Sequence, residues 1–350
     1  MLDKPLAAGS VSELTGDRIP LGPAQMGVYF DHVRHADKRR YNIGQITSIY
    51  GAVDVDRFRL AARQVVAANA ALNMSIRDDE KGPCQVYDAE ALSWIPPDDL
   101  LPFHDLRDCD DVDAACREIV EEALWQPFDL HKAPLFRWVL IRTGQDEFQW
   151  LQVYHHIVTD GWSGALILDQ VSQAYSDPSS SAPAPEEGLQ SYLKHLAAEQ
   201  AYKDSPAALR DGAFWRALLS DAALAEPFET IRERTTRTPF LREHVVLDTE
   251  TCDAVGQAAS ALGVASGLIL MAAVAVLEAR LSQNSDVVLG VPLLGRSGKE
   301  ARKVVSMSSN LGHVRIDDVW GQTVGSLLER IKSRQMAVLR RQLYRYEDLR

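Results

Sequence analysis

The chain has 350 residues, of which 46% are hydrophobic and 25% charged, so it is long enough for about two compact units of roughly 100–200 residues each. Acidic residues outnumber basic ones by 49 to 37, which argues against a nucleic-acid surface and against acidic partners, because both need a dense patch of Lys and Arg. The cysteines form neither CxxC pairs nor a close framework, so neither a zinc site nor a secreted disulfide scaffold is indicated and a reducing cytoplasm fits best: Cys84, Cys109, Cys116 and Cys252.

Three stretches set the predicted boundaries of the chain's parts. Residues 1–17 lack the apolar core of a secretory signal and are predicted to be a disordered lead-in. The longest uncharged run, 261–277, is shorter than a membrane span and is predicted to be a buried helix. Pro, Ser and acidic residues accumulate around 179–187, which predicts a linker between an N-terminal lobe (18–178) and a C-terminal lobe (188–350).

In the first half, apolar residues at three- and four-residue intervals predict a helix over 54–72, with a buried face made by Phe58, Ala61, Val65, Ala68 and Leu72. Further on, two apolar runs at 134–142 and 147–158, separated by a short polar turn, predict a β-hairpin. The second of these strands leads into a helix predicted over 164–175.

The second half is predicted to alternate strands with helices. EHVVLD (243–248) resembles a strand, 251–281 is mostly helix, and DVVLGVPLL (286–294) is predicted to be a buried strand. An amphipathic helix is predicted over 321–343, and the sequence shows no internal repeat.

The stretch YHHIVTDGWSG (154–164) lies at the predicted strand-to-helix turn. Neighbouring side chains on a strand point to opposite faces, so His155 and His156 are poorly placed to hold one metal ion. A serine hydrolase is also disfavoured, because Ser163 is followed directly by glycine, where the GxSxG pattern needs an intervening residue. A purely structural alternative remains, in which Asp160 caps the following helix and Gly161 eases the turn.

The string HHxxxDG in this setting resembles the active-site motif of the condensation domains of nonribosomal peptide synthetases. Other segments resemble that family's conserved stretches in the family's order, and together they cover about residues 18–350: LGPAQMGVYF with YNIG, QPFDLHKAPLFRWVL, VVLGVPLLGRSG, SSNLGHVRI and RQLYRYEDLR.

This resemblance implies an α/β fold of two lobes related to chloramphenicol acetyltransferase, each a mixed sheet covered by helices, meeting in a V with a tunnel at the junction. An upstream and a downstream carrier protein would present a donor thioester and an aminoacyl acceptor on phosphopantetheine arms, and an adenylation domain would load the acceptor. The reaction would form an amide, with no cofactor or metal bound directly and no nucleic acid or membrane as partner.

By resemblance, His156 acts as the base or positions the attacking amine, and the Gly161 N–H is a candidate partner for the oxyanion. His155 and Asp160 are expected to be structural, with Asp160 in an ion pair with Arg296 across the lobes. Substrate contact or structural support is expected from a further set, in which Trp162 is placed in the core: Trp162, Ser163, Arg296 and Asn310. The remaining histidines are interpreted as surface or satisfied ones: His32, His35, His104, His131, His195, His244 and His313.

Two departures from the family pattern leave alternatives open. The segment 68–73 lacks the arginines that the family often has after its first helix, and the family usually continues for several strands and helices beyond Arg350, which suggests a fragment. A non-catalytic carrier-docking module is therefore retained as an alternative, and an epimerization-type relative is retained because it shares HHxxxDG. Subtype features favour condensation domains that accept acyl starters, including siderophore types.

Overall fold

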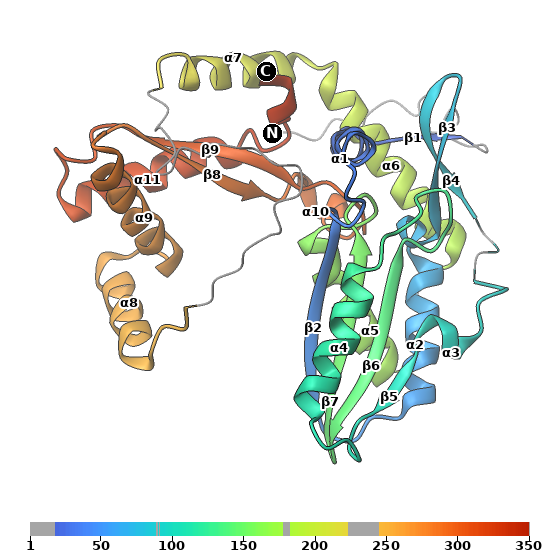
Figure 1. Ribbon diagram of the computed structural model, residues 1–350. Helices are drawn as coiled ribbons and strands as arrows, with labels where there is room; N and C mark the ends of the chain where they lie inside the picture. Colours follow the sequence, from blue (N-terminus) through green and yellow to red (C-terminus); the bar gives the residue numbers. More distant parts are fainter. Residues whose placement is uncertain (1–17, 89, 91, 178–182, 223–244, 350) are drawn as a thin grey trace. The chain divides into compact units, whose positions relative to one another are not determined.

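The computed structural model describes residues 18–88, 90, 92–177, 183–222 and 245–349, and the predicted lead-in (1–17) and His244 lie outside them. The chain divides into two compact units (Figure 1). The first contains the described residues up to Tyr202 together with 296–309, and the second contains the described residues within 203–295 and 310–350. Both mix helices with strands, so the predicted α/β class is confirmed.

The first unit is built on a four-stranded sheet in the order β2 (Asn42–Tyr50), β7 (Glu147–His155), β6 (Phe136–Gly144) and β5 (Phe103–Asp105). Its strands are antiparallel except for β5, which runs parallel to β6. A smaller antiparallel sheet has the order β1 (Ile19–Pro20), β4 (Gly82–Tyr87) and β3 (Met74–Asp79). The predicted hairpin is therefore confirmed as β6 and β7, although β6 spans Phe136–Gly144 rather than 134–142 and β7 ends at His155 rather than at residue 158.

The helices of the first unit are α1 (Pro23–Arg34), α2 (Val55–Ala68), α3 (Pro97–Leu100), α4 (Val112–Trp125), α5 (Gly161–Ser176), α6 (Pro185–Lys203) and α10 (Gly298–Ala301), with a 3-10 turn at Ala70–Asn73. Helices α2 and α5 pack against each other, whereas α4 contacts strands β2, β6 and β7. In Figure 1, α4 lies in front of the four-stranded sheet and α5 behind it. The sheet is therefore covered on both faces.

The core of the first unit contains the predicted face of the helix over 54–72. All five of its predicted positions are buried, although the helix itself ends at Ala68 and the chain continues as a 3-10 turn. The Phe58 ring meets Trp150 edge to face with 5.1 Å between centroids, and Trp150 meets Trp138 in the same way at 5.4 Å. Each fully buried large apolar side chain contributes about 1.5–3 kcal/mol, so this cluster anchors β7 and the turn that follows it.

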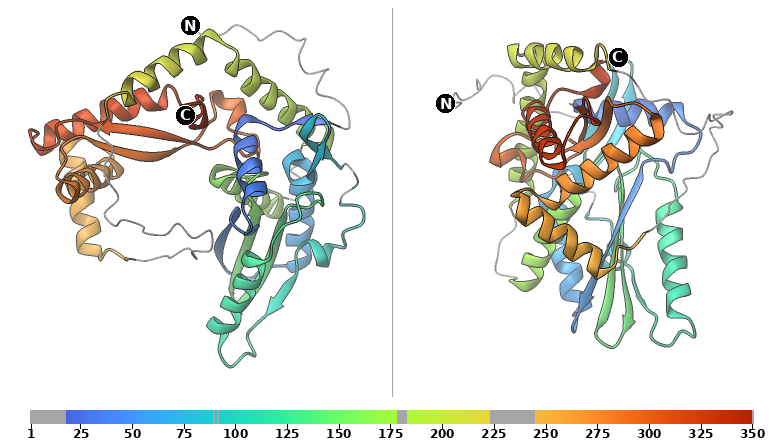
Figure 2. Two further views of the ribbon diagram at one scale, coloured as in Figure 1. Left: turned by 45° about the horizontal axis from the view of Figure 1, so that its top comes forward. Right: turned by 90° about the vertical axis from the view of Figure 1, so that its left-hand side faces the viewer.

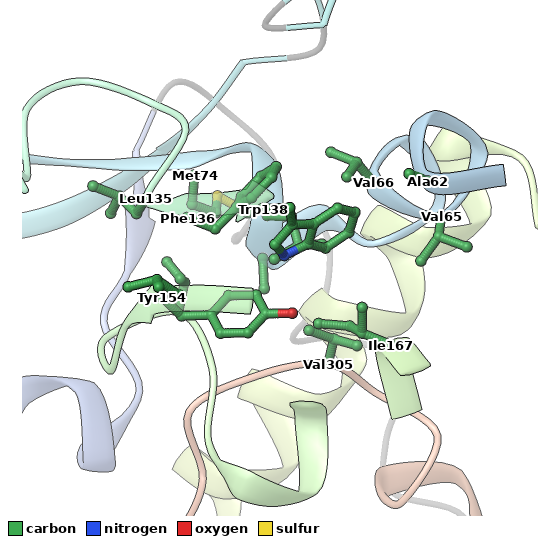
Figure 3. Packing of buried hydrophobic residues seen from close by; sticks show 14 of the residues in the cluster. Ala62, Val65, Val66, Met74, Leu135, Phe136, Trp138, Tyr154, Ile167 and Val305 are labelled. Atoms are coloured by element: carbon green, nitrogen blue, oxygen red, sulfur yellow. The ribbon is translucent and has the colours of Figure 1, made fainter. Parts of the chain in front are cut away.

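The boundary between the units differs from the predicted linker at 179–187. Helix α6 begins at Pro185, and its Tyr192 and Leu193 are buried in the first core. Val305 and Met307 belong to the same core, and Figure 3 shows Val305 beside Ile167 of α5. The buried apolar side chains of α6 and of residues 296–309 place both segments in the first unit. The Pro- and Ser-rich composition around 179–187 does not reveal this packing.

The second unit contains α7 (Pro206–Leu219), α8 (Thr249–Leu262), α9 (Ser266–Ser282), α11 (Val324–Leu339) and a 3-10 turn at Tyr346–Leu349, around the antiparallel strands β8 (Val287–Leu293) and β9 (Asn310–Ile316). Its core is formed by residues from α7, α9, the two strands and α11, among them Trp215, Ala275, Val314, Ile316 and Ile331.

Three predictions for this unit need correction. The run 261–277 is not one buried helix, because Gly263 ends α8 in the left-handed conformation at φ 64°, and α9 exposes Leu270 and Val274. Strand β8 buries only Val287 and Leu293, because β9 is its one neighbour among the described strands. The described part of the predicted strand 243–248 is an exposed coil.

The apolar helices α8 and α9 are bent relative to each other by 104°, as the two orange helices of Figure 2 show. Among the described residues, no single helix combines the length and hydropathy of a membrane span, and only this bent pair reaches both when its two helices are counted together.

Candidate active site

The stretch 154–164 forms a tight turn between β7 and α5. The backbone N–H of His156 donates to the Tyr41 carbonyl at 2.8 Å, and that of Val158 donates to the His155 carbonyl at 3.1 Å. Helix α5 begins at Gly161, three residues earlier than predicted, because the Asp160 carboxylate accepts a hydrogen bond from Ser163 N as an N-cap. The two histidines therefore occupy different settings, one at the strand end and one in the turn.

His155 is fully buried beneath the turn. Its Nδ1 accepts a hydrogen bond from Ile157 N at 3.1 Å, so in the neutral ring the proton sits on Nε2. The pKa of His155 is held well below its usual range, chiefly by burial and then by the charges that the neighbouring His32 and His156 would carry when protonated. A neutral imidazole closed off from solvent supports the structural role expected for His155.

His156 is only partly buried, in contrast to its neighbour. Its Nδ1 lies 2.7 Å from the Thr159 carbonyl oxygen. Since a carbonyl only accepts, Nδ1 must donate and therefore carries the ring proton. Within the described part of the chain, Nε2 has no hydrogen-bond partner, so the neutral ring presents an unused lone pair. The turn thus fixes the tautomer that a base needs.

Asp160 and Arg296 form the expected ion pair, at 2.7 Å between Oδ2 and Nη1, and both side chains are almost completely buried. The pair lies within the first unit, because residues 296–309 belong to that unit, and so it does not join the two units as predicted. Besides Arg296, the carboxylate accepts backbone N–H groups from Ser163 at 2.9 Å and from Ser308 and Ser309 at 3.0 Å.

This network decides the charge of the carboxyl group. Burial on its own would raise the pKa of Asp160, but the charge and hydrogen bonds of Arg296, with the backbone N–H groups, hold it below the ordinary value of 3.8. These partners surround the Asp160 carboxylate, which is closed to solvent. Asp160 therefore ties the start of α5 to the segment 296–309 and is not available to a substrate.

Ser163 belongs to the same buried network. Its hydroxyl donates to the Ser306 carbonyl at 2.7 Å and accepts from Arg296 Nη2 at 2.9 Å and from Ser306 N at 3.0 Å. A hydroxyl with these three partners and no neighbouring base is not an activated nucleophile.

Two residues of the predicted site lie elsewhere than expected. Trp162 is 41% exposed and not in the core, because the buried stripe of α5 begins at Ser163 and Gly164; its Nε1 donates to the Arg302 carbonyl at 2.8 Å. Asn310 begins β9 in the second unit, where its Nδ2 donates to the carbonyls of Gln342 and Tyr344 at 2.9 and 2.7 Å. Its side chain braces the end of the chain.

Gly161 is exposed, and a Cβ added to it would meet nothing within 4 Å. It is also absent from the glycines with positive φ, so neither space nor backbone conformation in the described structure requires glycine here. The easing of the turn that was expected of Gly161 is therefore not needed by the fold.

The segment 68–73, which lacks the family's arginines, is buried and uses an amide instead. Asn73 Nδ2 donates to the carbonyls of Val66 at 2.7 Å and Asn69 at 3.2 Å, so it satisfies backbone acceptors at the end of α2. Asn73 thus fills a structural role at this position without a charge.

Sequence reasoning missed two residues that contact the turn from α1. Gln25 Nε2 donates to the Ile157 carbonyl at 2.9 Å, and His32 Nδ1 lies 3.1 Å from His155 Nε2. In the sequence, the one indication of Gln25 is its place in LGPAQMGVYF, the segment that resembles the family's first conserved stretch. Among the described residues, no group of three or more His, Cys, Asp or Glu side chains is arranged to hold a metal.

A comparison with protein families matches residues 16–350 to the condensation domain. The dimodular nonribosomal peptide synthase of Bacillus subtilis (strain 168) is 28% identical over 327 residues, which cover 93% of this chain and 14% of that protein. The isonitrile lipopeptide synthase of Streptomyces coeruleorubidus is 29% identical over 337 residues, covering 95% of this chain and 22% of that protein. The chain thus spans less than a quarter of the curated relatives it matches.

Solved structures give the same result. The first condensation domain of the calcium-dependent antibiotic synthetase, in complex with a substrate analogue, superposes with a TM-score of 0.82 at 26% identity, covering 95% of this chain and 77% of that one. A variant of the starter condensation domain of rhizomide synthetase, in complex with C8-CoA, reaches 0.79 at 25% identity, covering 98% and 76%. With a family match over nearly its whole length, this chain belongs to the condensation domain family of nonribosomal peptide synthetases.

Proposed function

We propose that this chain catalyses amide formation between a donor acyl or peptidyl thioester and the amine of an aminoacyl acceptor, both carried on phosphopantetheine arms. Amide formation is the function of the family. The observation that carries the proposal is the fixed tautomer of His156, whose Nδ1–H binds Thr159 while Nε2 is left for a substrate. The retained histidines and Asp160 argue against a non-catalytic docking module.

The chemical demand on His156 is moderate. A free α-amine titrates near ~7.8, so roughly one in seven is already neutral at pH 7 and ready to attack. As the amine nitrogen bonds to the thioester carbon, Nε2 accepts the proton that this nitrogen loses. The tetrahedral intermediate then expels the sulfur, which takes up a proton to leave as the arm's thiol. Such a positioned base supplies a rate gain on the order of 10²–10⁴.

The remaining residues of the motif support this step without touching the reacting atoms, apart from Gly161. Its N–H stands in the first turn of α5, where the helix dipole favours negative charge, and we assign it to the developing oxyanion. Asp160, Arg296 and Ser163 hold the start of that helix through their buried network. The orientation of the Gly161 N–H therefore depends on the Asp160 cap.

A substitution at Gly161 separates these roles. Because a Cβ at this position meets no neighbour within 4 Å, Gly161→Ala should keep its melting temperature within about 2 °C of wild type, yet slow condensation at least tenfold by crowding the oxyanion. Gly188→Ala serves as the control for a destabilising substitution. A Cβ at Gly188 would collide with the Ala68 carbonyl oxygen, so this variant should have a lower melting temperature. Wild-type turnover by Gly161→Ala would remove Gly161 from the site.

We assign the donor side to an acyl starter. The solved starter domain was bound to C8-CoA and a relative is a lipopeptide synthase, and both proteins resemble this chain over at least 95% of its length. An acyl donor lacks an α-amine, so its site needs apolar walls and no carboxylate to bind an ammonium.

The assignment is tested with a matched set of acyl and aminoacyl donor thioesters and one fixed acceptor, using the full-length protein. We expect acyl donors to react at least tenfold faster, measured by mass spectrometry of the acceptor carrier. A tenfold preference for aminoacyl or peptidyl donors would reject the starter assignment while leaving amide formation intact.

The same assay distinguishes the epimerization-type alternative. An epimerase would change the configuration of an aminoacyl group without transferring it, so the acceptor carrier would gain no mass. Partners in this proposal are the donor and acceptor carriers and an adenylation domain. A cytoplasmic site is part of the proposal, supported by four cysteines that are all free thiols.

A further inference from the structure

Helix α1 contacts the catalytic turn through two buried polar side chains. Gln25 Nε2 donates to the Ile157 carbonyl at 2.9 Å, and His32 Nδ1 lies 3.1 Å from His155 Nε2. The two residues are seven apart, so they lie on the same face of the helix, and both are buried. One face of α1 is thus joined to the chain immediately before and after His156.

The hydrogen bonds around His155 and His32 have only one consistent arrangement when both rings are neutral. Ile157 N–H occupies His155 Nδ1, so His155 donates from Nε2, and His32 must accept at Nδ1. Burial lowers the pKa of both rings, which favours this neutral pair. The rings meet edge to face with 4.9 Å between centroids. Ile157 N–H and His32 Nδ1 therefore together hold the proton on His155 Nε2, and His155 in turn holds Ile157.

We propose that His32, assisted by Gln25, is a positioning residue for His156. His32 accepts a hydrogen bond from His155, and His155 in turn accepts one from Ile157 N–H. These two bonds hold the turn in the conformation that directs His156 Nε2 toward the substrate. This inference rests on the proposed function of His156. Neither α1 residue touches substrate in this proposal, and their contribution passes through residues 155 and 157. A displacement of about 1 Å at the reacting atoms can cost on the order of 10²-fold in rate, so small changes in this turn matter.

Two isosteric replacements of His32 give the sharpest test. Asn places an amide acceptor where the imidazole Nδ1 stands, whereas Gln places it where Nε2 stands, away from His155. We expect His32→Asn to recover most of the wild-type kcat, and His32→Gln and His32→Ala to lose tenfold or more, with KM for the acceptor carrier changed by less than about twofold. Equal melting temperatures of the Asn and Gln variants would assign the difference to positioning.

Gln25 offers an independent variant. Gln25→Glu replaces the N–H that binds the Ile157 carbonyl with a second acceptor, so it should lower kcat in the same way as His32→Gln. Equal kcat values for His32→Asn and His32→Gln, or a loss that appears only in KM, would overturn the positioning role.

A spectroscopic readout separates this inference from the proposed function. In the full-length protein, the ¹⁵N shifts of the His155 ring should report the Nε2–H tautomer in wild type and His32→Asn, and a mixture of tautomers in His32→Gln. An unchanged His155 tautomer in His32→Gln would contradict the inference even if the enzyme is active. Absence of amide product from wild type would instead contradict the proposed function, while the shifts still test His32.

Discussion

His156→Ala should abolish condensation in the full-length protein, with a rate loss on the order of 10²–10⁴, while the protein stays folded. The side chain is partly exposed and makes one hydrogen bond, to Thr159, whose removal costs only about 1 kcal/mol. The backbone bond from His156 N to Tyr41 does not depend on the side chain. The loss should therefore appear in chemistry rather than in folding.

His156→Asn refines this prediction. Its amide can still donate to the Thr159 carbonyl from the position of Nδ1, so the turn is kept, but no atom replaces Nε2. We expect it to be as inactive as His156→Ala, and we expect His104→Ala, which removes an exposed histidine of β5, to retain wild-type activity. The assay is mass spectrometry of the acceptor carrier after both carriers are loaded. Near-normal product from either His156 variant would refute the catalytic assignment.

Asp160→Ala and Arg296→Ala should each lower the melting temperature substantially, and the double variant should be no worse than either one. Removing one member leaves the other charge buried without its partner, which costs about 3–5 kcal/mol. For a cooperative unit of this size, the loss corresponds to a shift of roughly 10 °C. Thermal unfolding of the four proteins forms a double-mutant cycle, and fully additive losses would contradict the coupling.

The stability of this network should also depend on pH in one direction. The pKa of folded Asp160 lies below the ordinary 3.8, so its contribution is complete at pH values above about 4 and is lost as pH falls through the folded pKa. Asp160→Asn lacks this ionisation, so the stability difference between it and wild type should shrink below pH 4. A difference that stays constant down to pH 2 would contradict the assignment.

Local patterns predicted the part of the site that is close together in sequence. The existence of the β6–β7 hairpin, the capping residue Asp160 and the buried face of α2 all follow from spacing and residue type, whereas the ends of the two strands do not. A carboxylate beside a buried strand needs a partner, which predicts an ion pair for Asp160, and the family resemblance guides the choice of Arg296.

Contacts between distant segments were not predictable in this way. His32 and His155 are 123 residues apart, and Gln25 and Ile157 are 132 apart, so no period in the sequence relates them. Residue type alone predicts Trp162 in the core, whereas its position on α5 falls outside the buried stripe. Helix α9 likewise reads as buried from its composition, although burial depends on the neighbours that the fold supplies.

The account depends on His156 Nε2 addressing the amine of the acceptor. The most direct measurement is a crystal structure of the full-length protein with an aminoacyl-pantetheine analogue at the acceptor position. The account predicts that the amine nitrogen lies within about 2.6–3.2 Å of Nε2, with Nδ1 still donating to Thr159. An amine too far from Nε2 for a direct hydrogen bond or for one bridging water would contradict it. An imidazole turned so that Nδ1 faces the substrate would contradict it as well.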